Sequence, residues 1–202
     1  MPRKPLITPC PLDSSMRGLI ISYTRCGDSE ALLRRLLAGW GLRLNESGRP
    51  GVAWLEAPEP VLIGLLESWR TGSLPMPGVS LVRPFDVKLD LHRPLVPAQS
   101  VVVDSTGMIE DAIRRLLTGR GIRGVRVRAR GYGLGVSNTL RGIANGVLND
   151  LGIRVSRSSS MVLSVEALLR VSGFVSVFIG LYPRRYLVRP SHAYLGPPAL
   201  GD

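Results

Sequence analysis

The stretch Gly124–Gly142, GVRVRARGYGLGVSNTLRG, decides the fold of the second half of this 202-residue chain. Its first seven residues alternate small apolar side chains with Arg126, Arg128 and Arg130. A strand has a side-chain period of two, so it would place the three arginines on one face and the apolar side chains on the other. Glycines and then a helical pattern from Ser137 follow. The stretch therefore predicts a strand, a turn and a helix.

The surrounding sequence is strongly basic. Residues 112–149 contain eight arginines and no Asp or Glu, in a chain whose net charge is +11. Of 26 basic residues only Lys4 and Lys88 are lysine, and the planar guanidinium of arginine suits phosphate. A strongly cationic chain most often binds a polyanion, of which nucleic acid is the commonest. The alternative is a solvated face whose arginines pair with carboxylates of another domain.

The residues expected to contact nucleic acid lie in and around this field. Contacts to phosphate make binding sensitive to salt and position the nucleic acid without reading its sequence. The candidate RNA-binding residues are Arg120, Arg123, Arg126, Arg128, Arg130, Gly131, Gly133, Arg141, Arg154 and Arg157.

The glycines at 131, 133 and 135 admit an enzymatic interpretation as well. Arg-x-x-Gly-x-Gly between a strand and a helix resembles the acetyl-CoA pyrophosphate loop of the GNAT acetyltransferases, where backbone N–H groups hold the pyrophosphate. The same glycines resemble a methyltransferase cofactor loop, but Arg130 stands where that loop has an acidic residue. The spacing differs from the dinucleotide-binding fingerprint. The glycines therefore indicate either a tight turn beside a phosphate or an acetyl-CoA loop.

The first half of the chain predicts a small α/β domain. Apolar runs at 17–24, 51–57 and 79–90 predict strands, and amphipathic patterns at 27–41 and 58–70 predict helices between them. Trp40 and Trp69 fall on the expected packing faces of these helices. The order β-α-β-α-β suits a ferredoxin-like unit.

The second half predicts another α/β unit after a change in composition at HRPLVPAQS, 92–100. A helix is expected at 107–119, a strand at 124–130, a helix capped by Ser137 or Asn138 at 137–152, and strands at 161–170 and 173–182. The expected organisation is a flexible N-terminal arm 1–16, a ferredoxin-like domain 17–92, a linker 93–100, an α/β RNA-binding domain 101–182 and a C-terminal tail 183–202.

The remaining composition excludes several classes. Two cysteines (Cys10, Cys26) and two histidines (His92, His192) are too few and too scattered for a disulfide framework or a metal site. The N-terminus lacks the apolar core of a signal peptide, and no run of 18 apolar residues predicts a membrane span. We expect a cytoplasmic protein without a metal or other cofactor, and no membrane partner.

From about Val101 to Tyr182 the chain resembles a THUMP domain, an RNA-binding module of several tRNA-modifying enzymes. The matching run is VRVRARGYG, SNTLRGIANGVLNDLGIRV and MVLSVEALLRVSGFVSVFIGL. In that family a basic strand precedes a polar-capped helix, a strand ending in Val-Glu follows, here Val165-Glu166, and another strand closes the domain. THUMP domains usually follow a ferredoxin-like domain. The sequence GLIISYTRCGDSEALLRRLL resembles the opening strand and helix of that domain.

The resemblance implies tRNA binding, largely by the acceptor stem and 3′ end, on the basic face formed by both domains. Most THUMP proteins carry a catalytic domain, but only residues 183–202 follow the last expected strand. The chain therefore looks like the stand-alone, non-catalytic adaptor that helps a separate acetyltransferase make acetylcytidine in tRNA. No catalytic constellation is evident, and Glu166 is expected to be an ion-pair partner. Tyr132, Tyr182, Tyr186 and Tyr194 are the candidates for base stacking. A scaffold protein of a ribonucleoprotein is a third interpretation.

Overall fold

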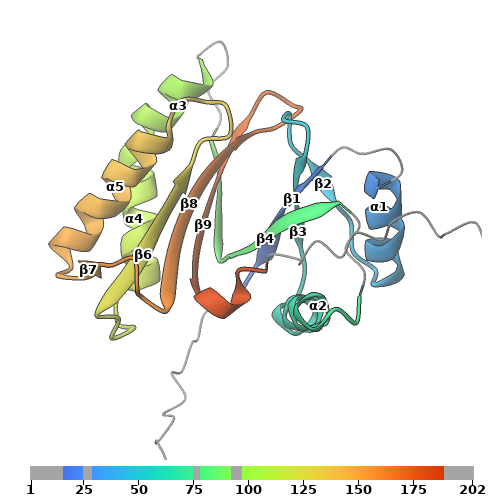
Figure 1. Cartoon of the computed structure of the whole chain (residues 1–202). Coiled ribbons are helices and arrows are strands. Elements are labelled where there is room, and N and C mark those ends of the chain that lie inside the picture. The colour runs from blue at the N-terminus through green and yellow to red at the C-terminus, as the bar shows by residue number, and fades with distance from the viewer. Residues whose placement is uncertain (1–15, 25–28, 75–77, 92–96, 189–202) are drawn as a thin grey trace, which may run out of the picture.

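A computed structural model describes residues 16–24, 29–74, 78–91 and 97–188. Two β-sheets face each other and carry helices on their outer sides, with α1 and α2 beside one sheet and α3 to α5 beside the other (Figure 1). This is a mixed α/β fold, as the sequence predicted. The N-terminal arm except Met16, both cysteines, both histidines and Tyr194 lie outside the described residues.

The first sheet has the ferredoxin-like topology that the sequence predicted. Its strands lie in the order β2-β3-β1-β4, and all their pairings are antiparallel. Helices α1 and α2 each connect two strands that are separated in the sheet by one other strand, which is the split βαβ arrangement. The elements are β1 (Gly18–Tyr23), α1 (Ser29–Gly39), β2 (Asn45–Glu46), β3 (Val52–Glu56), α2 (Glu59–Thr71) and β4 (Val79–Phe85).

The second sheet lies in the order β5-β9-β8-β6-β7. Strand β6 pairs in parallel with both β7 and β8, while β9 pairs antiparallel with β8 and β5. The elements are β5 (Val87–Leu91), α3 (Ala98–Asp104), α4 (Thr106–Leu117), β6 (Gly124–Arg130), α5 (Ser137–Asp150), β7 (Arg154–Val155), β8 (Met161–Leu169), β9 (Val175–Pro183) and the 3₁₀ helix η1 (Arg184–Tyr186). The order β6, α5, β8, β9 matches the element order that the THUMP resemblance implies.

The extended segment expected at 79–90 is two strands that belong to different sheets. β4 completes the first sheet and β5 pairs with β9 in the second, with Asp86 between them. Asp86 N–H donates to the Ile179 carbonyl (2.9 Å), and Leu181 N–H donates to Asp86 Oδ2 (2.7 Å). The chain thus changes sheets at Asp86, and α3 begins inside the expected linker 93–100. The domain boundaries themselves remain a prediction.

Other differences are local and follow from packing. The helix expected at 107–119 is present as α4, and a short helix that the sequence did not predict, α3, precedes it. Helix α5 begins at Ser137 without a side-chain cap, because Ser137 Oγ accepts the Gly131 N–H instead (2.9 Å). β8 continues three residues beyond Glu166, which therefore lies within the strand and not at its end. Trp69 is buried, but Trp40 lies just past α1 with 41% of its surface exposed.

An apolar cluster joins the two sheets. Phe178 of β9 contacts Phe85 of β4 edge-on, with ring centroids 4.9 Å apart, and Trp54 of β3 at 5.5 Å. Ile20, Val52 and Leu168 complete the buried part of the cluster. Gly180 allows the close approach, since a β-carbon there would lie 2.4 Å from the Pro84 carbonyl oxygen. The two sheets are therefore held together by a shared core.

We expect Asp86 to make stability depend on pH. Burial raises the pKa of its carboxyl from 3.8 to about 6, against the lowering influence of the Leu181 N–H and the Arg120 charge. The folded protein therefore binds this proton more tightly than the unfolded chain, and the free energy of unfolding falls as pH rises from about 4 through about 6.

Asp86→Asn tests this expectation because the amide oxygen can still accept the Leu181 N–H. Urea unfolding should show the variant more stable than the unaltered chain at pH 8, on the order of 1 kcal/mol, and nearly equal to it at pH 4. A variant with the same pH profile as the unaltered chain would contradict the assignment.

Candidate nucleic-acid interface

The alternation predicted for 124–130 is present in β6. Val125 and Ala129 are buried in the core beneath α5, and Val127 packs against that core. Arg126 and Arg128 are half-buried and Arg130 is exposed on the opposite face of the strand. Their partners across the ladder to β8 are Val162, Ser164 and Glu166, so these side chains share one face of the sheet. This face of the second sheet is turned toward the first sheet (Figure 1).

The electrostatics of this face reflect its crowded positive charge. The pKa of the Arg128 guanidinium is lowered, first by burial and then by the neighbouring charge of Arg130. The Arg128 Nε atom is buried and has no hydrogen-bond partner among the described residues. A phosphate oxygen placed here would relieve both the desolvation of Arg128 and its repulsion by Arg130.

Further arginines gather where β6 begins. Arg120 and Arg123 lie in the turn before β6, Arg154 is in β7, which pairs with the start of β6, and Arg157 is in the turn after β7. Two more members of this group gave no signal in the sequence. Arg184 and Arg185 of η1 are exposed, and the Arg184 N–H donates to the Ser160 carbonyl (2.6 Å), which fixes η1 beside the turn between β7 and β8.

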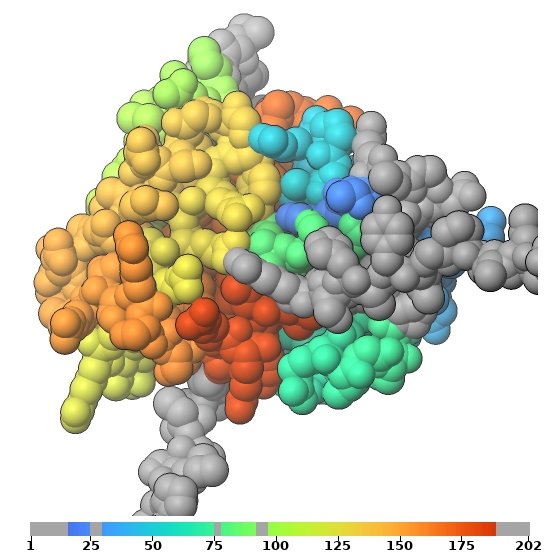
Figure 2. Space-filling model, viewed as in Figure 1, coloured from blue at the N-terminus to red at the C-terminus, as the bar shows by residue number. Residues whose placement is uncertain are grey.

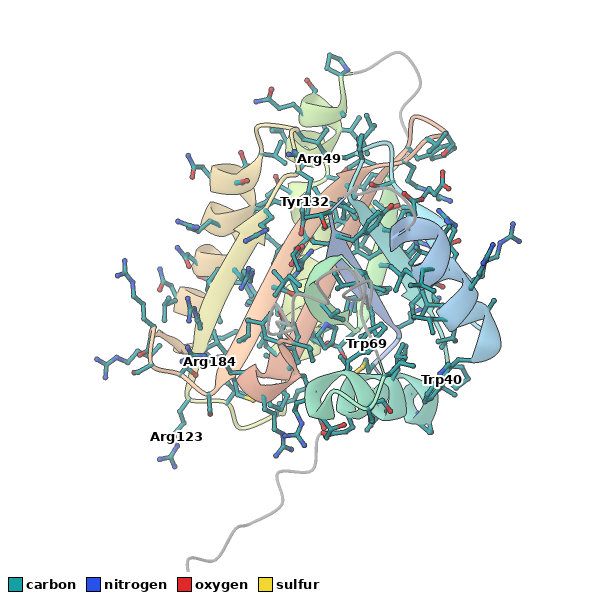
Figure 3. The ribbon with its side chains drawn as sticks, turned by 45° about the vertical axis from the view of Figure 1, so that its right-hand side comes forward. Trp40, Arg49, Trp69, Arg123, Tyr132 and Arg184 are labelled. Atoms are coloured by element: carbon teal, nitrogen blue, oxygen red, sulfur yellow. The ribbon has the colours of Figure 1, made fainter. Side chains whose placement is uncertain are left out.

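The figures show this gathering directly. Arg123 and Arg184 lie at the same end of the second sheet in Figure 3. The residues of η1 adjoin those of β6 and the turn after β7 in Figure 2. We call the combined set the arginine surface: Arg120, Arg123, Arg126, Arg128, Arg130, Arg154, Arg157, Arg184 and Arg185.

Arg141 is the one predicted arginine that the fold separates from this surface. It is exposed on α5, which covers the face of the sheet opposite to the β6 arginines. The helical pattern in the sequence did not show which way the Arg141 side chain points. The arginine surface therefore excludes Arg141.

In the part of the chain that the structure describes, the arginine surface has no carboxylate at ion-pair distance. Among the described residues none of its members forms an ion pair within 4.0 Å, whereas basic residues elsewhere do. Arg34 pairs with Glu30 and Glu46, and Arg70 pairs with Glu67. The alternative that the β6 arginines pair with acids of the first domain is therefore not what the described residues show. The surface carries a free positive field that suits a polyanion.

The glycines at 131, 133 and 135 have steric reasons of their own. A β-carbon on Gly131 would lie 2.8 Å from Val136 Cγ2, and Gly133 and Gly135 adopt left-handed backbone angles of φ +87° and +70°. A β-carbon on Gly133 would also lie 2.9 Å from Nη1 of Arg49, an exposed arginine between β2 and β3 that gave no signal in the sequence. Gly131 and Gly133 therefore shape the turn; contact with phosphate remains a prediction.

A buried polar cluster holds this turn to both sheets. Arg83 of β4 and Glu166 of β8 are fully buried and form an ion pair, with Arg83 Nε 2.8 Å from Glu166 Oε1. The Tyr132 hydroxyl donates to Glu166 Oε2 (2.5 Å) and accepts from Arg83 Nη2, which also donates to Ser22 Oγ (3.0 Å). Glu166 is thus the ion-pair partner that the sequence predicted, but Arg83 and Tyr132 gave no sequence signal for this role.

Of the tyrosines proposed for base stacking, Tyr132 and Tyr182 are turned inward, and Tyr194 lies outside the described residues. Tyr132 packs against the apolar cluster between the sheets, and burial followed by the Glu166 charge raises the pKa of its hydroxyl. Tyr182 is 2% exposed, and burial raises its pKa to about 12. Tyr186 is half-buried, with Arg185 over its ring at 5.3 Å. The interface consequently offers charge more than aromatic platforms, as suits recognition of RNA shape.

The described residues contain no group of three or more His, Cys, Asp and Glu side chains placed to hold a metal ion. In the same part of the chain, the helices are all too short or too polar to cross a lipid bilayer.

Comparison with known proteins finds likeness in structure and none in sequence. No protein-family model matches the chain, and no curated protein matches it. A 4-thiouridine synthetase in an RNA complex with bound ATP superimposes with a TM-score of 0.48 at 18% identity, over 83% of this chain and 42% of that one.

Two further solved structures are similar. TrmN from Thermus thermophilus has a TM-score of 0.49 at 19% identity, over 81% of this chain and 45% of its own. PH1313 from Pyrococcus horikoshii has a TM-score of 0.49 at 14% identity, over 83% of this chain and 55% of its own. The chain thus spans about half the length of the structures it matches.

We expect removal of one partner of the Arg83–Glu166 pair to destabilise the protein more than neutralisation of both partners. Arg83→Met leaves a buried carboxylate without its counter-charge, so urea unfolding should show a loss of about 3 to 5 kcal/mol. Adding Glu166→Gln neutralises that carboxylate, and the double variant should regain at least about 1 kcal/mol of this loss.

The exposed pair of Arg70 and Glu67 supplies the control. Arg70→Met should change the free energy of unfolding by less than about 1 kcal/mol because water screens that pair. A double variant less stable than Arg83→Met alone would show that the charge of Glu166 is not what makes the single change costly.

Proposed function

We propose that this protein is a non-catalytic tRNA-binding protein that presents tRNA to a separate modification enzyme. The observation that carries the proposal is the arginine surface, whose charge no carboxylate neutralises among the described residues. Nine arginines drawn from two strands, two turns and a 3₁₀ helix form an extended basic field, which fits a phosphate backbone better than a small anion.

The finer assignment rests on the THUMP resemblance. A ferredoxin-like unit comes first, and a basic strand, a helix, a strand containing Val165-Glu166 and a closing strand follow it. In that family this arrangement binds tRNA. We therefore propose tRNA as the ligand and, as the partner, an acetyltransferase that forms acetylcytidine.

An acetyltransferase activity of the chain itself is the second candidate. One observation favours it, since among the described residues no side chain caps α5, whose N-terminus follows the glycine turn. Free N–H groups at a helix N-terminus suit a pyrophosphate. Acetyl-CoA at saturating concentration should then raise the melting temperature of the protein, whereas the adaptor proposal predicts no shift.

The test of RNA binding is fluorescence anisotropy with labelled tRNA across a salt series. We expect the triple change of Arg126, Arg128 and Arg130 to Ala to weaken binding about 100-fold or more. The slope of log K against log salt should become shallower by roughly 2 to 3, because about 0.7 to 0.9 of slope accompanies each of the three lost phosphate contacts.

A triple change of Arg35, Arg43 and Arg70 to Ala is the matched control. These exposed arginines belong to the first domain, so the control removes the same charge from outside the arginine surface. It should reduce affinity no more than about threefold and leave the slope unchanged. Equal losses in the two triple variants would mean that net charge, and not this surface, causes the binding.

A further inference from the structure

We propose that Tyr132 is a positioning residue that joins Arg49 of the first domain to the arginine surface, so that both domains hold one stretch of RNA phosphate backbone. The inference rests on the proposed function, because it specifies how the RNA-binding surface is assembled. It concerns two residues, Tyr132 and Arg49, for which the sequence offered no such role.

Tyr132 adopts a backbone conformation that needs support. Its φ of +31° makes it the one non-glycine residue with positive φ among those the structure describes. A side chain in the left-handed region costs about 1 to 2 kcal/mol, so other contacts must compensate for it. Those contacts are the hydrogen bonds of its hydroxyl to Glu166 and Arg83, the Arg83 guanidinium 5.6 Å from the ring centroid, and the apolar cluster between the sheets.

The anchor is shared between the two domains. Arg83 belongs to β4 of the first sheet and Glu166 to β8 of the second, and both side chains are fully buried. The Tyr132 hydroxyl bonds to both. The turn after β6 is therefore fixed relative to the first domain as well as the second.

The side chain of Arg49 lies directly beside Gly133, the residue that follows Tyr132. Its Nη1 lies 2.9 Å from the point where a β-carbon of Gly133 would be, so the guanidinium packs on the bare backbone of the turn. Its own backbone is held by Ser47, whose Oγ donates to the Arg49 carbonyl (2.7 Å) and accepts the Arg49 N–H (3.2 Å). Figure 3 shows Arg49 and Tyr132 close together at the end of the sheet opposite to Arg123 and Arg184.

Arg49 extends the arginine surface onto the first domain. Among the described residues Arg49 has no ion pair, and it is exposed beside the end of β6 that carries Arg130. A phosphate backbone that follows β6 from Arg123 to Arg130 would meet Arg49 next. If the Tyr132 anchor is lost, the turn beneath Arg49 is free to move and the contact from the first domain is no longer held in register with the strand.

The test is a double-mutant cycle on tRNA affinity and on its salt dependence, with the full chain. Arg49→Ala should weaken tRNA binding about threefold to tenfold and reduce the slope by about 0.9, as for one phosphate contact. Tyr132→Phe keeps the ring and removes only the hydroxyl, and it should give the same change. The double variant should be no weaker than either single variant, because both changes remove the same contact.

Arg185→Ala supplies the control, since Arg185 lies at the far end of the surface on η1. In the double variant of Arg185→Ala and Tyr132→Phe, the losses of tRNA-binding free energy from the two changes should add in full. Urea unfolding of each variant, and assays well below the melting temperature, separate binding from stability. If Tyr132→Phe does not fold, the paired change Arg83→Met with Glu166→Gln replaces it in the cycle, because it removes the Arg83 contact that ties Tyr132 to the first sheet without leaving a buried charge unpaired.

The outcomes separate this inference from the proposed function. Additive losses for Arg49 and Tyr132, or a Tyr132→Phe variant that loses stability but keeps the full salt slope, would overturn the positioning role while RNA binding stands. Failure of the unaltered chain to bind tRNA would overturn the proposed function and the inference together. A non-additive cycle with equal slope changes supports both.

Discussion

The buried ion pair of Arg83 and Glu166 is the interaction on which the rest of this structure depends. Arg83 belongs to the first sheet and Glu166 to the second, and both charged side chains are fully buried. Such a pair adds little net stability, because desolvation offsets its attraction, but it penalises every arrangement in which the two partners are apart. The pair therefore fixes how the two sheets face each other, and the aromatic contacts of Phe178 with Phe85 and Trp54 supply the apolar stabilisation around it.

That arrangement determines the character of the arginine surface. Glu166 is the acid that lies across the ladder from Arg130, and its charge is engaged by Arg83 and by the Tyr132 hydroxyl. The β6 arginines are consequently left without a carboxylate partner among the described residues. The positive charge of the β6 arginines is therefore left without a close counter-charge among the described residues, whereas the negative charge of Glu166 is paired in the buried cluster between the sheets. The same cluster holds the glycine turn, so charge and backbone geometry are set by one group of contacts.

Local periodicity made much of the fold predictable from the sequence. The alternation of valine and arginine in β6, the amphipathic pattern of α2 and the glycine turn before α5 are short-range signals, and the structure contains all three. Strands β4 and β5 were expected as one segment because both are extended, and only tertiary pairing reveals that Asp86 separates them. The helical pattern also failed for Trp40, which lies just past the last residue of α1.

The candidate site was predictable only in part for the same reason. Arginines within 120–130 and at 154 and 157 come together because they are close in sequence or join neighbouring strands. Arg184 and Arg185 reach the surface through the pairing of β9 with β8, and Arg49 through the contact between domains, neither of which leaves a local pattern. A fully buried arginine such as Arg83 runs against the usual preference of that residue for the surface.

Ultraviolet cross-linking of bound tRNA, with the cross-linked peptides identified by mass spectrometry, would show directly which surface of the protein contacts the RNA. We expect cross-links in the peptides that contain β6 and the glycine turn, residues 154–157 and η1, and none above background in α1 or α2. Cross-links concentrated on α1 and α2, with β6 and η1 unlabelled, would contradict the assignment of RNA to the arginine surface.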